Sequence, residues 1–172
     1  MAIGALLLLS VTIGCSKKSG GNDVTPLNAT DQQFVTNAGY NNVDEIDAGY
    51  LASTNGSDSS VRAFALLLVN NYGSAQSALV LVADSFHFTL ASGQDPAHVS
   101  LLNSLSTLSG VNFDTTYLRM QINDDQAAIS LYQAELSNGQ NAAVKAYVNG
   151  YLPAIQAHLN TADSLITMHI GH

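Results

Sequence analysis

Apolar residues recur three and four positions apart along most of the chain, which is the spacing that places side chains on one face of an α-helix. This pattern predicts long helices over about residues 31–53, 59–86, 114–136 and 141–168. The apolar stripe is sustained through the second of these ranges, from Val61 to Phe86. Because no segment reads as a convincing strand, we expect an all-α fold.

The connection between the second and third predicted helices, residues 87–113, contains Pro96 and two glycines, which interrupt long helices. A short helix over residues 97–108 is expected inside this connection. Four amphipathic helices bury their apolar faces best against one another. We therefore expect an antiparallel four-helix bundle over residues 30–170, with the short extra helix between helices 2 and 3. The connection is also long enough to carry a crossover from one end of the bundle to the other.

An apolar run opens the chain and ends just before Cys15, the only cysteine. The run is shorter than the ~20 residues that span a membrane and has the length of a signal-peptide core. Residues 12–15, Thr-Ile-Gly-Cys, resemble the lipobox of bacterial lipoproteins. We expect residues 1–14 to be a lipoprotein signal peptide, and residues 15–29 to be a flexible tether that starts at a lipidated Cys15. The alternative is a buried apolar segment with an ordinary free cysteine.

Lipidation of Cys15 predicts a protein outside the cytoplasm that is held to a membrane by its lipid anchor. We expect the outer membrane as the site of the anchor. Because no acidic cluster follows Cys15, we expect the domain to face the periplasm. The net charge of −8, with five Lys and Arg, argues against nucleic-acid binding. Charged residues make up 10% of the chain, which leaves neutral surface suited to an envelope protein partner or to self-assembly.

Each predicted long helix carries one polar residue near the middle of its apolar stripe: Glu45, Tyr72, Asp125 and His158. The helical rise places these residues at depths that let them approach one another in the middle of the core. Ionisable side chains are costly there unless they are paired, hydrogen-bonded or bound to a metal. One interpretation is therefore an internal hydrogen-bonded cluster, with Tyr72 bonded to it.

The other interpretation of these four residues is a metal site, because carboxylate and imidazole groups from different helices build the metal sites of helical bundles. Its ligands would be Glu45, Asp125 and His158, with Tyr72 as a fourth. A carboxylate-rich set favours Fe, Mn or Zn without deciding among them.

Segments in all four long helices carry a family resemblance. They are Glu45-Ile-Asp-Ala-Gly-Tyr-Leu-Ala52, Val61-Arg-Ala-Phe-Ala65, Phe113-Asp-Thr-Thr-Tyr117 and Tyr151-Leu-Pro-Ala-Ile-Gln-Ala-His158. In this order they resemble the DUF4142 family of exported bacterial proteins, many of which are named as outer membrane proteins. The resemblance covers about residues 31–168 and implies a ferritin-like four-helix fold. It brings no settled biochemical activity with it.

The chain departs from the family at positions that bear on a metal site. The family usually has Asp-His where this chain has Asn71-Tyr72, and His where this chain has Asp125. Glu45 and His158 are kept. If the family residues form a metal site, two of its four ligands are changed here. The chain also lacks the paired Glu-x-x-His motifs of di-iron bundles, so we expect no ferroxidase.

No pattern of a catalytic nucleophile or of a phosphate-binding loop occurs in the sequence, so an enzyme is not favoured. Two functions remain. One is a lipid-anchored envelope bundle that acts through protein contacts. The other is an envelope metal-binding or stress-related protein. Of the remaining histidines, His87 and His98 fall in the connection and are expected to be exposed, and Met168, His169 and His172 near the C-terminus are weaker candidates for soft metals.

Overall fold

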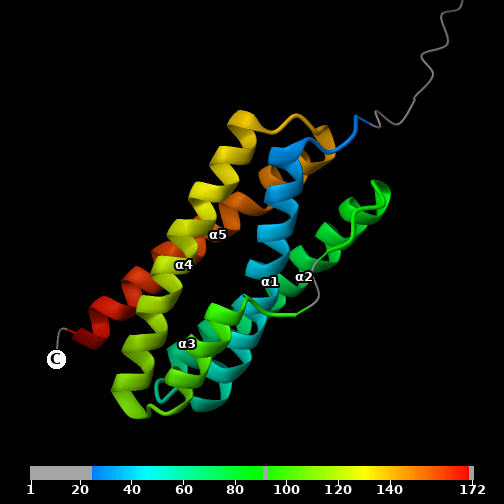
Figure 1. Cartoon of the computed structure of the whole chain (residues 1–172). Helices are drawn as coiled ribbons and strands as arrows, with labels where there is room; N and C mark the ends of the chain where they lie inside the picture. Colours follow the sequence, from blue (N-terminus) through cyan, green and yellow to red (C-terminus); the bar gives the residue numbers. More distant parts are fainter. Residues whose placement is uncertain (1–24, 91–92, 171–172) are drawn as a thin grey trace, which may run out of the picture.

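The computed structural model describes residues 25–90 and 93–170, and all the regular structure in these ranges is helical (Figure 1). The helices are α1 (Ala29–Asn55), α2 (Ser59–Ser85), α3 (Pro96–Ser106), α4 (Gly110–Asn138) and α5 (Ala142–Ile170). The expected all-α bundle with a short extra helix between its second and third long helices is therefore confirmed. The predicted signal peptide, Cys15 and most of the tether lie outside the described residues.

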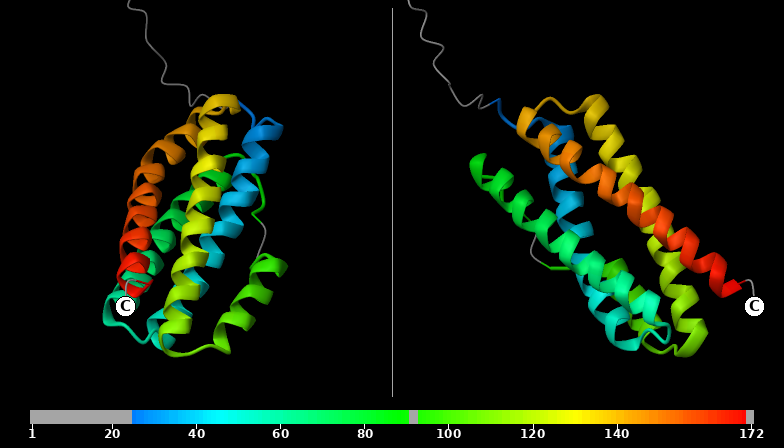
Figure 2. Two further views of the ribbon diagram at one scale, coloured as in Figure 1. Left: turned by 90° about the vertical axis from the view of Figure 1, so that its left-hand side faces the viewer. Right: turned by 180° about the vertical axis from the view of Figure 1, so that it is seen from behind.

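The four long helices surround one elongated core. α1 packs mainly on α2 and α4 mainly on α5, while α1 also contacts α4 and α2 also contacts α5. α2 and α4 therefore lie diagonally across the bundle, and neighbouring long helices run antiparallel (Figure 2). Residues 86–90 and 93–109, which include α3, lie along the outside of the bundle, and α2 and α4 start at the same end (Figure 1). This is the crossover that the long connection allowed.

A buried aspartate fastens the end of the bundle at which α1 begins. Asp31 accepts hydrogen bonds from the backbone N–H groups of Gln140 (2.9 Å) and Asn141 (3.1 Å), in the turn between α4 and α5. Its other oxygen accepts the N–H of Asn28 (2.8 Å), the residue that caps α1. Burial raises the pKa of Asp31, but these N–H groups lower it by more, so that the net pKa lies below its usual value.

A second buried aspartate fastens the opposite end. Asp114, in the first turns of α4, accepts hydrogen bonds from the backbone N–H groups of Ser57 and Asp58, both at 2.9 Å. These two residues lie in the turn between α1 and α2, which Arg62 also closes through bonds to the carbonyl oxygens of Gly56 and Ser57. Charge-assisted bonds to backbone N–H groups are among the stronger hydrogen bonds in proteins. The helix ends are thus set in register at both ends of the bundle.

The apolar core is divided into two clusters. The cluster near the α1–α2 turn includes Ala48, Leu68, Tyr72, Leu118 and Ala162. The cluster near the start of α1 includes Ala38, Ala75, Leu79, Ala128 and Ile155. On every long helix a short stretch separates the residues of the two clusters, and these stretches lie at one level of the bundle. The side chains that fill that level form the candidate site.

The short helix α3 covers α1 and α4 from outside. Asp95 caps its start, and Pro96 occupies the first turn, where a missing N–H costs nothing. The segment before it is tied to α1, because Gln94 donates to Asp47 and the N–H of Asp95 donates to Asp44 at 3.1 Å. His98 points inward and is only 8% exposed. The expectation that His98 is exposed was therefore wrong, because the docking of α3 buries it.

Candidate functional site

A polar layer crosses the middle of the core, between the two apolar clusters. The side chains that were singled out on each helix, Glu45, Tyr72, Asp125 and His158, are all buried there. Gln121, one turn before Asp125 on α4, is buried in the same layer. The helices thus bring the four predicted polar residues to one level, as the spacing along each apolar stripe indicated.

Two hydrogen bonds join α2 to the other helices inside this layer. The hydroxyl of Tyr72 donates to Asp125 Oδ1 at 3.0 Å. The side-chain amide nitrogen of Asn71 lies 2.9 Å from His158 Nε2, so it donates to this nitrogen and leaves the proton of a neutral imidazole on Nδ1. The rings of Tyr72 and His158 also pack together, with centroids 5.5 Å apart.

Two adjacent residues of α2, Asn71 and Tyr72, each supply a hydrogen bond to a buried side chain of the layer. The expected hydrogen bond between Tyr72 and the cluster is present. Asp125 and His158 therefore have protein partners inside the core.

Burial sets the charge of the layer. It raises the pKa of Glu45 well above its usual value, and the nearby carboxylates of Asp124 and Asp125 raise it further. Burial also raises the pKa of Asp125 to about 7, although the Tyr72 hydroxyl lowers it. Burial lowers the pKa of His158 to about 4. Near neutral pH, His158 is therefore uncharged, and burial favours the protonated form of both carboxyl groups.

Several buried polar atoms of the layer have no hydrogen-bond partner within the described part of the chain. They are Glu45 Oε2, Asp125 Oδ2, His158 Nδ1, Tyr117 Oη and both side-chain polar atoms of Gln121. Buried polar groups in folded proteins nearly always have a partner. These atoms are the chemical basis for considering a bound ion or internal waters at this level.

The geometry also bears on the predicted metal ligands. Glu45, Asp125 and His158 share the layer, but over residues 25–90 and 93–170 no three His, Cys, Asp or Glu side chains are grouped closely enough to hold one ion. Metal binding at these residues would thus require their side chains to move together.

A second acidic group lies just outside the layer, under α3. Asp44 of α1 and Asp124 of α4 both face His98, whose positive form lowers the pKa of each carboxyl. Burial is nevertheless the larger effect and raises the pKa of Asp44 to about 6. Asp44, Asp124 and Gln121 were not predicted as site residues from the sequence. The sequence does contain a sign of this acidic group, in the adjacent pairs Asp44-Glu45 and Asp124-Asp125. In each pair, one carboxyl points into the core of the bundle and the other lies beside it.

A polar network continues from the layer toward the start of α1. Asn42 donates from its side chain to Gln76 and to the hydroxyl of Tyr147, both at 3.1 Å. The Tyr147 hydroxyl lies 3.3 Å from that of Tyr132. These bonds link α1, α2, α4 and α5 above the layer, so the middle of the bundle is joined by side-chain hydrogen bonds as well as by apolar packing.

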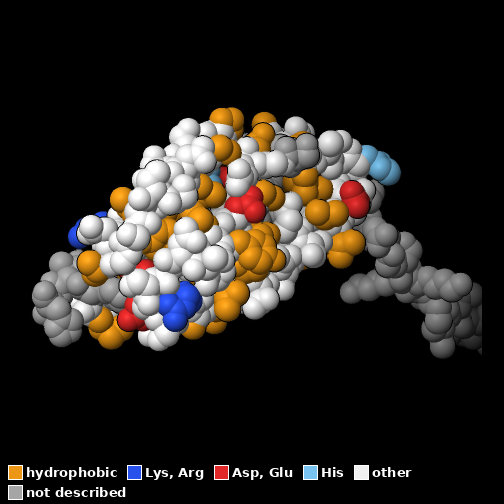
Figure 3. All heavy atoms as spheres, turned by 90° about the horizontal axis from the view of Figure 1, so that it is seen from below, with side chains coloured by type: hydrophobic (Ala, Val, Ile, Leu, Met, Phe, Trp, Pro, Cys, Tyr) orange, Lys and Arg blue, Asp and Glu red, His pale blue; other side chains and the backbone are white. Residues whose placement is uncertain are grey.

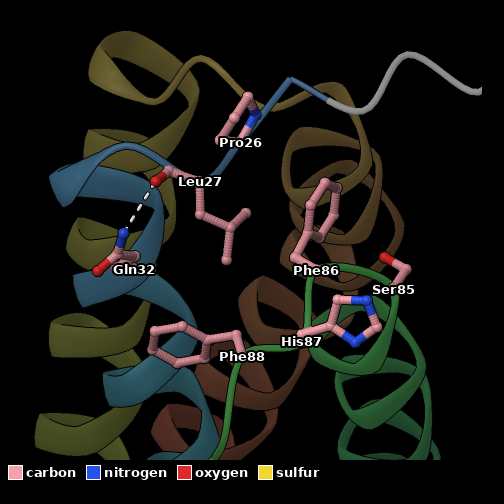
Figure 4. Close-up of a pocket in the computed structure, with 7 residues that line it drawn as sticks. All are labelled: Pro26, Leu27, Gln32, Ser85, Phe86, His87 and Phe88. Atoms are coloured by element: carbon pink, nitrogen blue, oxygen red, sulfur yellow. Dashed lines mark hydrogen bonds between the residues drawn. The ribbon is translucent and has the colours of Figure 1, made fainter.

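Two pockets in the described part of the chain are formed mainly by residues outside the layer. One of about 410 Å³ lies at the end of α2, where residues including Leu27, Phe86 and Phe88 line it (Figure 4). Another of about 650 Å³ lies between α3 and α4 and is lined largely by apolar side chains, including Leu101, Leu105 and Met120. Of the residues of the layer and of the acidic group under α3, only Asp124 lines this pocket. Neither pocket gathers a set of catalytic groups.

The outward face of α2 is the most apolar surface among the long helices. Leu66, Leu67, Val80 and Leu81 are all exposed on it, Leu81 by 72%. Residues 63–83 contain no charged side chain. By length and composition α2 is also the one described helix that could cross a membrane, a test that core helices of soluble proteins pass as well. The low charge extends to the face shown in Figure 3, where charged side chains are few and isolated.

Comparisons with known proteins agree with this architecture. A family model described as "Domain of unknown function (DUF4142)" matches residues 16–165. Among solved structures, a DUF305 fragment from Deinococcus radiodurans superposes with a TM-score of 0.74 at 15% identity, covering 83% of this chain and 99% of that one. A DUF305 protein from Streptomyces coelicolor, described as secreted, gives 0.70 at 12% identity, covering 81% and 93%.

A third similar structure is the protein CopM in its Cu(I)-bound form, with a TM-score of 0.69 at 15% identity, covering 81% of this chain and 97% of that one. No curated protein gave a significant match. At these identities the similar structures establish the fold alone.

Proposed function

The chain belongs to the DUF4142 family, and from that premise we propose that it is a lipid-anchored protein of the bacterial cell envelope that acts through protein contacts of its helical bundle. The lipobox-like residues before Cys15 support the anchor, with the outer membrane as its site and the domain facing the periplasm. The similarity to a DUF305 protein described as secreted supports a place outside the cytoplasm.

The observation that carries this proposal is the outward face of α2. Large apolar side chains that are exposed and grouped on one uncharged helix face mark an interaction site. Leu81 and Leu66 are 72% and 49% exposed, and no charge lies between Arg62 and Asp84 to keep this face in water. In this proposal the polar layer is structural: its internal hydrogen bonds fix how the four helices pack.

The proposal is tested by photo-crosslinking of the full-length, membrane-bound protein in bacteria. A photoreactive amino acid replaces Leu81 on the outward face of α2 or, as the control, Gln133, which is exposed on the diagonal helix α4. We expect discrete protein adducts from position 81 and none from position 133. Absence of protein adducts at position 81, with the protein correctly in the membrane, would contradict a contact function for this face.

A second candidate function, an envelope metal-binding or stress-related protein, is favoured by the unpartnered atoms of the layer. Glu45 Oε2, Asp125 Oδ2 and His158 Nδ1 are buried and without hydrogen bonds in the described chain. The CopM structure has a related fold and is Cu(I)-bound, but Cu(I) prefers soft thiolate and thioether ligands. The carboxylate-rich set in this chain instead suits Fe, Mn or Zn.

Metal content measured by mass spectrometry on untagged protein tests this candidate. About one equivalent of Fe, Mn or Zn is expected if the layer binds metal, with loss in His158→Ala and retention in His87→Ala, whose histidine is exposed. Protein that contains no metal, before and after incubation with these ions, would exclude the candidate.

A further inference from the structure

The outward face of α2 has a pattern that is symmetric about its middle. Two large apolar residues lie near each end of the face, Leu66 and Leu67 at one and Val80 and Leu81 at the other. The side chains between them are small or neutral: Asn70, Gly73, Ser74 and Ser77. A single positive residue, Arg62, precedes the uncharged stretch, and a single negative residue, Asp84, follows it.

The midpoint of this pattern falls between Gly73 and Ser74. Leu66 and Leu81 are equally far from it along the chain, as are Leu67 and Val80, and Asn70 and Ser77. When two copies of a helix pack antiparallel about a two-fold axis, residues at equal distances on either side of the axis face one another. The face is thus complementary to itself.

We propose that the partner of this face is a second copy of the same chain, bound by antiparallel packing of α2 on α2 with the two-fold axis at Gly73–Ser74. This inference rests on the proposed contact function and names its partner. In such a pair Leu66 of one copy packs on Leu81 of the other. Arg62 comes within one turn of the oppositely charged Asp84 of the second copy.

The middle of the face suits a close helix crossing. A Cβ built on Gly73 would meet no atom within 4 Å, so the space outside this glycine is open. Gly73 and Ser74 therefore let the two backbones approach, and the leucines at either end are then buried. The two-fold axis makes the two ends of the pair equivalent, so each contact between the copies occurs twice.

A membrane surface fits this face less well than a second copy does. Helices that lie in a membrane interface usually carry several Lys or Arg and large aromatic residues. Arg62 is the only basic residue of α2, and the chain has a net charge of −8, which opposes binding to anionic lipid. Asn70, Ser74 and Ser77 would also be placed against hydrocarbon.

The test adds one cysteine at a time to the full-length protein, which keeps Cys15; the variants are oxidised in isolated membranes and examined on non-reducing gels. In the proposed pair the two copies of Ser74→Cys lie beside the axis, within the Cα distance of about 4.4–6.8 Å that a disulfide needs. The two copies of Ser77→Cys are displaced along the helices by about 10 Å, which is out of reach. Both serines are exposed on the same helix, so they are a matched pair.

We expect a disulfide-linked dimer from Ser74→Cys, several-fold less from Ser77→Cys, and none from the wild type, whose only cysteine is Cys15. Adding Leu66→Glu to Ser74→Cys should reduce the linked fraction several-fold, whereas Leu101→Glu, exposed on α3, should leave it unchanged. Equal linkage at positions 74 and 77, or no effect of Leu66→Glu, would overturn the proposed pairing.

The outcome can be separated from that of the proposed function. If Ser74→Cys does not link and the photoreactive residue at position 81 captures a different protein, the contact function stands and the second copy is excluded. If position 81 instead captures lipid, the face binds the membrane, and both proposals fail.

Discussion

Tyr72 and Asp125 form a hydrogen bond across the diagonal of the bundle, from α2 to α4, with the hydroxyl 3.0 Å from Oδ1. These two helices are not direct neighbours in the ring of four, so the bond passes through the centre of the core. It gives one oxygen of the buried Asp125 carboxyl a donor, while Asp125 Oδ2 stays without a partner in the described part of the chain.

Removal of the Tyr72 hydroxyl should destabilise the fold. Tyr72→Phe leaves the Asp125 carboxyl without its donor in a buried site, and we expect a loss of about 1–3 kcal/mol in the free energy of unfolding. Urea denaturation of the two proteins measures this difference. Tyr151→Phe is the control, because the Tyr151 hydroxyl bonds Ser74 O at the surface and should matter little. Equal losses of stability in Tyr72→Phe and Tyr151→Phe would contradict a larger contribution from the buried hydrogen bond.

Stability should rise when the pH is lowered from 8 to 6. The pKa of Asp125 is about 7 in the folded protein, against an unfolded value near 3.9, so the folded state binds an extra proton between these values. The free energy of unfolding therefore increases as the pH falls through 7, by about 1 kcal/mol for this group between pH 8 and pH 6. Glu45, whose pKa is also raised, adds in the same direction.

His158 should oppose this rise at lower pH and offset part of it. Its pKa is about 4 in the folded protein, below the unfolded value near 6.5, so its contribution is lost as the pH falls below about 6.5. Urea denaturation at a series of pH values measures both trends. Asp125→Asn should flatten the rise between pH 8 and pH 6, and Asp163→Asn, at an exposed position of α5, should not. An unchanged profile in Asp125→Asn would refute the raised pKa.

The close approach of α1 and α2 depends on Gly49. A Cβ at this position would lie 2.7 Å from Val69 Cγ2 and 2.9 Å from the backbone oxygen of Ala65, so the helices would have to separate. We expect Gly49→Ala to cost about 1–3 kcal/mol of stability. Gly150→Ala, where a Cβ would meet nothing within 4 Å, should instead stabilise by up to about 1 kcal/mol. Thermal unfolding of both variants distinguishes these opposite signs.

His98 should hold α3 against the bundle. It lies between Asp44 and Asp124, and with Leu105 it is one of the two buried residues of α3. In His98→Ala we expect faster hydrogen exchange of the amides of residues 96–106 and little change in the exchange of α4 and α5. Ser100→Ala, which alters an exposed side chain, is the control. Unchanged exchange in α3 would mean that other contacts hold it.

The parts of the fold that the sequence predicted are those with a strong helical period. The stripe of α5 shows this, because Val144, Val148, Ile155 and His158 are all buried as expected. On α4 the spacing predicts a stripe through Leu118, Ile122 and Asp125, but Gln121 is buried in place of Ile122, which is only partly covered. The apolar pattern of one helix does not predict this difference, because which side chains are covered also depends on how the neighbouring helices pack against it.

The candidate site was predictable only in part, for a similar reason. Glu45 and Asp125 stand out as carboxylates within apolar stripes, and their meeting follows from helix length. Asp44, His98 and Asp124 lie off the stripes, and α3 buries them by docking across two helices that are distant in sequence. Local periodicity carries no information about that docking.

The proposed function requires that the outward face of α2 is covered by protein in the cell envelope. The most direct measurement is the rate at which a hydrophilic maleimide labels Leu81→Cys in isolated membranes and again in dilute, detergent-purified protein. Gln133→Cys on α4 provides the exposed reference in both states. We predict that labelling at position 81 is several-fold slower in membranes than in the purified protein, while labelling at position 133 is the same in both. Equal rates for position 81 in the two states would contradict the claim.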